Sequence, residues 1–136
     1  MSDNIKDKIE DKIIDLIALG ASGRLVIFKP EKSLGRSTGE ADKDLVIEKR
    51  GAYKKKVVSL NIYEGENFQQ LLSQKIKPEE NFYLMFVDFD VVKQSVNDNF
   101  WVIPSLDLES ISVKTDFSKF LMAKKDFIEF LIETLA

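Results

Sequence analysis

The sequence predicts an α/β protein in which helices cover both faces of a mixed β-sheet. An amphipathic helix is expected over about residues 4–19, because isoleucines recur at helical spacing from Ile5 to Ile17. Short runs rich in β-branched and aromatic residues follow it, as is typical of strands. The segment FYLMFVDFD (82–90) is apolar on both of its alternating faces. That pattern predicts a central strand covered on both sides by helices.

The remaining elements follow one another along a single domain, residues 1–136. RLVIFKP (24–30) predicts a first strand, and two further strands are expected at about 44–49 and 54–63, around a turn near RGAY. We also expect a short helix in NFQQLLSQ (67–74), the central strand at 82–90, a strand in FWVIPS (100–105) and a closing helix at 117–135. The predicted order is therefore helix, three strands, helix, two strands, helix.

Composition excludes several kinds of chemistry. The chain contains no cysteine and no histidine, which excludes disulfides, thiolate metal sites and catalytic triads that use imidazole. No apolar run approaches the roughly 20 residues that a membrane span needs. The first residues, MSDNIKDKIEDK, are too charged for a signal peptide. We therefore expect a cytoplasmic protein without a membrane partner.

The net charge of −3 is distributed unevenly. Between Arg24 and Lys56, ten basic residues stand against five acidic ones, so this segment carries +5 and the rest of the chain −8. One interpretation is that these side chains are only solvated surface. The other is a basic face that binds DNA or RNA. The candidate nucleic-acid-binding residues are Arg36, Lys49, Arg50, Lys54, Lys55 and Lys56.

Four polar residues occupy positions where apolar ones are expected. Glu10 falls within the apolar stripe of the first helix, and Asp44 opens the second strand. Ser59 and Asn61 are set inside the third strand, where they share one face because side chains alternate along a strand. A structural interpretation is that Glu10 either extends into solvent or meets a lysine, and that Ser59 and Asn61 hydrogen-bond to neighbouring backbone or to each other. The functional interpretation is a pocket lined by all four.

This arrangement resembles the PD-(D/E)XK restriction-endonuclease-like superfamily, including small Holliday-junction-resolvase-like proteins. The resemblance implies an α-β-β-β-α-β core with a further strand and a C-terminal helix. In that superfamily an aspartate before the second strand and an acid-x-lysine on the third hold magnesium and position a water, and many members add a glutamate from the first helix. Asp44 matches the aspartate and Glu10 suits the glutamate. In SLN (59–61), Ser59 stands where the acid would be and Asn61 where the lysine would be.

The departure from the acid-x-lysine pattern has chemical consequences. Magnesium prefers carboxylates, waters and phosphate as ligands, whereas serine is neutral and asparagine brings no positive charge. Loss of one preorganised group of this kind typically costs roughly 10²- to 10³-fold in rate. We therefore expect a nuclease-like domain that has lost hydrolysis, needs no cofactor and acts as a nucleic-acid-binding or accessory module.

Two alternatives remain open. One is an active magnesium-dependent nuclease with a rearranged site, in which Asp44 would be the metal ligand. The other is a protein-interaction or structural module that has kept only the fold and forms a homodimer.

Overall fold

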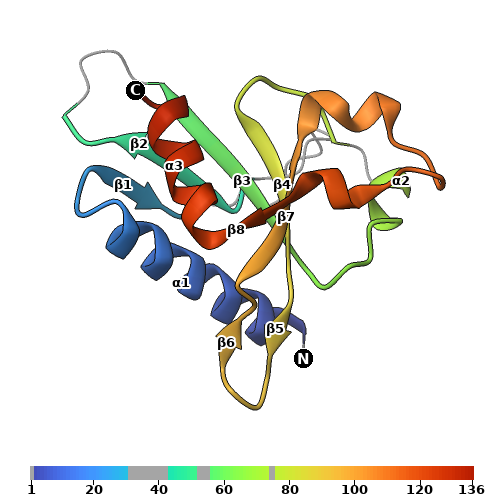
Figure 1. The fold of residues 1–136 in the computed structure, drawn as a ribbon, viewed down its shortest axis with the longest axis horizontal. Coiled ribbons are helices and arrows are strands. Elements are labelled where there is room, and N and C mark those ends of the chain that lie inside the picture. The colour runs from blue at the N-terminus through green and yellow to red at the C-terminus, as the bar shows by residue number, and fades with distance from the viewer. Residues whose placement is uncertain (1, 31–42, 52–55, 74–75) are drawn as a thin grey trace.

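The computed structural model describes residues 2–30, 43–51, 56–73 and 76–136 (Figure 1). The helices are α1 (Ser2–Gly20), α2 (Gln70–Ser73) and α3 (Lys124–Thr134), with two 3₁₀ helices, η1 (Ser105–Ser110) and η2 (Phe117–Phe120). The strands are β1 (Leu25–Phe28), β2 (Leu45–Lys49), β3 (Val57–Glu64), β4 (Phe82–Val87), β5 (Phe89–Asp90), β6 (Ser95–Val96), β7 (Asn99–Pro104) and β8 (Leu121–Ala123). The predicted α/β class is confirmed.

Six of the strands form one mixed sheet in the order β1-β2-β3-β4-β7-β8. The β3–β4 pair is parallel and the other neighbours are antiparallel. A parallel pair needs a crossover, which the segment containing α2 supplies. The predicted central strand is confirmed for residues 82–87, because β4 lies between β3 and β7 and buries both Phe86 and Met85, which point to opposite faces. Its expected end at residue 90 is wrong, because Phe89 and Asp90 form β5, which pairs with β6 in a separate two-stranded sheet.

The sheet separates two hydrophobic cores. On one face α1 and α3 pack against it (Figure 1). Ile13, Leu60 and Phe127 are fully buried in the core on this face. On the other face, Phe86 is fully buried with Ile103 beneath the segments that carry α2, η1 and η2. Within the described residues, no helix combines the length and apolar character needed to span a lipid bilayer.

The predicted closing helix at 117–135 is wrong in its first part. The helix α3 begins only at Lys124, and residues 117–123 form η2 and the strand β8, which pairs with β7. The reason is that the apolar residues of this segment serve two cores. Phe117 packs with the core on the α2 side, whereas Phe127 packs with the core under α1. One straight helix cannot reach both faces of the sheet, so the chain crosses the sheet edge as a strand.

A close approach between α1 and α3 occurs at Gly20, the last residue of α1. A Cβ atom built there would lie 2.8 Å from Cγ1 of Ile128 on α3. We expect Gly20→Ala to lower the free energy of unfolding by about 1 to 3 kcal/mol, because overpacking outweighs the gain in helix propensity. Urea unfolding measures the change. Ile128→Ala opens a cavity of its own, so the double variant should lose less stability than the sum of the two single losses. A Gly20→Ala variant as stable as the parent would contradict the expectation.

Candidate functional site

The pairing of β2 with β3 brings Asp44 and Asn61 together. Val46 pairs with Ser59 and Leu45 with Leu60, so Asp44, one residue before β2, lies beside Asn61. Leu60 belongs to the core under α1. The side chains of Ser59 and Asn61 alternate with it and therefore point to the opposite face. The shared face expected for these two residues is thus observed.

The carboxylate of Asp44, just before the start of β2, accepts a hydrogen bond from the part of β3 that extends beyond β2. β2 begins at Leu45, and the backbone N–H of Ile62 on the longer β3 donates to Asp44 Oδ2 at 2.7 Å. The other oxygen, Oδ1, lies 3.1 Å from Nζ of Lys6 on α1. Asp44 is only 4% exposed. Both carboxylate oxygens are therefore engaged by the protein, and Asp44 joins the sheet margin to the first helix.

Asn61 connects Asp44 to Tyr63. Its Oδ1 accepts a hydrogen bond from the backbone N–H of Asp44 at 3.0 Å. Its side chain also hydrogen-bonds to the Tyr63 phenol, which lowers the pKa of that phenol, although burial has the larger effect and raises the pKa overall. The negative charge of Asp44 adds to the increase. Asn61 thus acts as a neutral bridge between a buried carboxylate and a phenol that stays protonated.

Glu10 approaches from the helical side of the sheet. It lies in α1 and is 7% exposed, and its Oε1 is 3.7 Å from Nζ of Lys29, which also contacts Asp11 at 3.1 Å. The ion pair with Asp11 and the neighbouring carboxylate of Glu10 raise the pKa of the Lys29 ammonium. A lysine therefore meets the glutamate, which is one of the two outcomes that the structural interpretation allowed. The other, a side chain that extends into solvent, is wrong because Glu10 is buried.

Asp44 supplies the carboxylate of this arrangement, and its partners Ser59 and Asn61 on β3 are uncharged. Asp44 has both oxygens committed, Asn61 is neutral and Ser59 is half-buried, with its backbone N–H donating to Asn81 O at 2.9 Å. In the part of the chain that the structure describes, no three acidic side chains are grouped to hold a metal ion. The described contacts of Asp44 and Asn61 instead satisfy polar groups at a buried strand end.

The lysines nearest to this site are paired with acids. Lys6 contacts Asp44, and Lys43 lies 3.0 Å from Glu79 while its ammonium sits 3.4 Å from the centroid of the Phe82 ring. Their charges are thus already compensated locally, which leaves less positive potential to attract an incoming phosphate.

Three of the candidate nucleic-acid-binding side chains lie near the other end of β2. Lys49, Arg50 and Lys56 are exposed, whereas Arg36, Lys54 and Lys55 lie outside the described residues. Lys49 is five residues from Asp44 along an extended strand, roughly 16 Å at 3.3 Å per residue. The described candidate nucleic-acid-binding residues on β2 and the Asp44 site therefore occupy opposite ends of the strand.

The pairing of β1 with β2 adds a residue that the sequence interpretation did not select. Leu25 pairs with Lys49, and the backbone N–H of Arg50 donates to the carbonyl oxygen of Arg24 at 2.9 Å. Arg24 is exposed as well. We call Arg24, Lys49, Arg50 and Lys56 the basic end.

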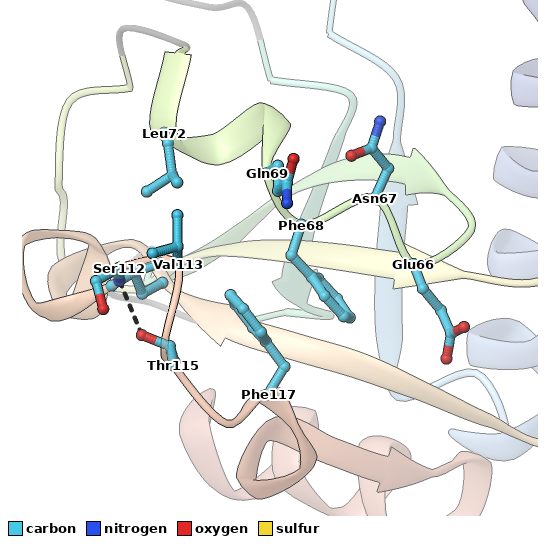
Figure 2. Close-up of a pocket in the computed structure, with 10 residues that line it drawn as sticks. Glu66, Asn67, Phe68, Gln69, Leu72, Ser112, Val113, Thr115 and Phe117 are labelled. Atoms are coloured by element: carbon cyan, nitrogen blue, oxygen red, sulfur yellow. Dashed lines mark hydrogen bonds between the residues drawn. The ribbon is translucent and has the colours of Figure 1, made fainter.

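A separate cavity of about 440 Å³ lies beside α2 (Figure 2). Phe68 and Phe117 stack with their ring centroids 4.1 Å apart, and Leu72 and Val113 point toward each other across the opening. The charged side chain among its described lining residues is Glu66. The negative charge of Glu66 makes this cavity a poor match for phosphate, so it does not extend the nucleic-acid interpretation.

Two residues of the site, Lys6 and Tyr63, were not selected from the sequence, although local spacing relates each of them to a selected residue. Lys6 precedes Glu10 by four positions and therefore shares its face of α1, and Tyr63 follows Asn61 by two on the same face of β3. The contact of Lys6 with Asp44 depends on how α1 packs, which no local pattern reveals. Comparisons with protein-family models, curated proteins and solved structures find no match for the chain.

Proposed function

We propose that this chain is a restriction-endonuclease-like domain that has lost metal-dependent hydrolysis and binds nucleic acid through its basic end. The element order α1-β1-β2-β3-α2-β4 agrees with the core that the family resemblance implies. The adjacency of Asp44 and Asn61 also agrees with that resemblance. Fold analogy alone does not define a function, so the proposal depends on the chemistry of the two regions.

The engagement of Asp44 carries the proposal that hydrolysis is lost. Its Oδ2 accepts from the Ile62 N–H and its Oδ1 pairs with Lys6, at 2.7 Å and 3.1 Å. A magnesium ion would have to displace one of these partners and would find neutral side chains at positions 59 and 61. Without an acid at position 59 and a lysine at position 61, the acid-x-lysine positions hold neither the metal nor the attacking water by charge.

A cleavage assay tests this part of the proposal. We expect the purified protein to leave labelled single-stranded, duplex and branched DNA and RNA intact with magnesium or manganese, and its melting temperature to be unchanged by either ion. Asp44→Asn is the matched control, because it removes the charge while keeping an oxygen acceptor. Metal-dependent cleavage that disappears in Asp44→Asn would instead support the alternative of an active nuclease with a rearranged site.

The exposed cations support the nucleic-acid part of the proposal. The four side chains of the basic end are exposed, and in the described part of the chain none of them forms an ion pair with an acid. Unpaired cations can release the counterions condensed on a phosphate backbone, which supplies most of the non-specific affinity of such proteins. Absence of any binding at physiological salt would favour the protein-interaction alternative.

A further inference from the structure

A cavity of about 420 Å³ opens within the basic end, between the start of β1, the end of β2 and the last turn of α3. Its apolar floor includes Leu25, Ile132 and Leu135, and its cationic rim includes Arg24, Lys49 and Arg50. We call it the basic cavity. Its size falls within the range of about 300 to 1,000 Å³ that is usual for small-molecule sites.

The two arginines of the rim are held in place by the backbone. Arg24 donates from Nε to the carbonyl oxygen of Ala21 at 3.0 Å, and Arg50 donates from Nε to that of Gly23 at 2.8 Å. A guanidinium has five N–H donors, so these bonds leave the terminal nitrogens of both side chains available. Fixing the guanidinium in advance lowers the entropy lost when an anion binds.

The floor of the cavity offers a surface for a planar or apolar group. Leu25 and Leu135 are 5% and 4% exposed, and Ile132 is half-buried against the core under α1. A cationic rim over an aliphatic floor suits a ligand that carries an anionic group on a compact, weakly polar body. A nucleotide has this chemistry, with its phosphate at one end and its base at the other.

We propose that the basic cavity holds the terminal nucleotide of a bound strand, with its phosphate between Arg24 and Arg50 and its base against the floor. This inference rests on the proposed nucleic-acid binding. A terminal phosphate carries a charge of about −1.5 to −2 near neutral pH, whereas an internal phosphodiester carries one negative charge. Three clustered cations therefore favour a strand end over the interior of a strand. A free mononucleotide shares the same chemistry.

Fluorescence anisotropy with single-stranded oligonucleotides of one sequence tests the inference. The strands carry a 5′-phosphate, a 3′-phosphate or only hydroxyl ends, and a circular strand has no end. We expect one of the phosphorylated strands to bind about tenfold more tightly than the hydroxyl-ended strand, as charge-assisted hydrogen bonds to the extra charge imply. Equal affinities for all four strands would overturn the inference while leaving the proposed function intact.

Two variants locate the effect in the cavity. Arg50→Gln should abolish the preference for a terminal phosphate, whereas Lys125→Gln, which removes one exposed charge at the opposite end of α3, should preserve it. Ile132→Gln changes the floor without changing charge, and should weaken the phosphorylated strand more than the hydroxyl-ended one. A preference that survives both cavity variants would overturn the inference. Thermal melting confirms that each variant is folded.

Binding of adenosine monophosphate tests whether the ligand of the basic cavity is a free mononucleotide or the end of a strand. Chemical-shift changes around Ile132 that Arg50→Gln removes, without binding of any strand, would support the cavity as a nucleotide site and overturn the proposed strand binding. No binding of either the mononucleotide or the strands would overturn both.

Discussion

Replacing Asp44 with alanine is expected to lower the free energy of unfolding by about 2 to 4 kcal/mol. The substitution leaves the buried N–H of Ile62 without its acceptor, which costs about 1 to 3 kcal/mol, and it removes a charge-assisted hydrogen bond, which is stronger than a neutral one. The lost ion pair with Lys6 adds little, because that lysine is 47% exposed.

Asp44→Asn is the control for this prediction, because its amide oxygen can still accept from the Ile62 N–H. We expect it to cost about 1 kcal/mol, the difference between a charged and a neutral acceptor. Urea unfolding gives both values, and amide hydrogen exchange at Ile62 reports the bond itself. An active site usually sacrifices stability for function, so replacing its charged residues often stabilises the protein. A stabilised Asp44→Ala variant would therefore contradict a structural role.

The central strand shows which part of the fold the sequence reveals. β4 is apolar on both faces, and burial of Met85 and Phe86 follows from that composition alone. The segment 117–123 is also rich in apolar residues, yet their spacing does not distinguish a helix on one face from a strand that crosses the sheet edge. Pairing with β7 decides between them, and that pairing is a long-range event.

In the candidate site, too, local patterns predict some of the neighbours and long-range packing decides the others. Alternation along β3 was enough to place Ser59 and Asn61 on one face, and the hairpin brings Asp44 beside Asn61. The partner of Asp44 on α1 could not be predicted, because Lys6 reaches it through helix packing. Likewise, 25 residues separate Arg24 from Arg50 in the sequence, and the β1–β2 pairing makes them neighbours.

Raising the salt concentration should reduce nucleic-acid affinity steeply. If the four cations of the basic end each neutralise one phosphate of a duplex, the logarithm of the binding constant falls with a slope of about −0.9 per contact. The total for four contacts corresponds to a loss of about 10²-fold in the binding constant between 50 and 200 mM salt. The charge of −8 on the chain outside residues 24–56 repels the same phosphates, which favours their approach to the basic end.

Charge-removing variants determine whether the basic end is responsible for that slope. The double variant Lys49→Gln/Arg50→Gln should reduce the salt slope by the contribution of about two contacts. Each neutralised phosphate contributes separately to counterion release. The control Lys8→Gln/Lys125→Gln removes the same number of charges from exposed positions of α1 and α3 and should leave the slope unchanged. If both pairs reduce the slope equally, binding reflects the net charge of the protein. In that case the cluster between Arg24 and Lys56 is the solvated surface of the first interpretation.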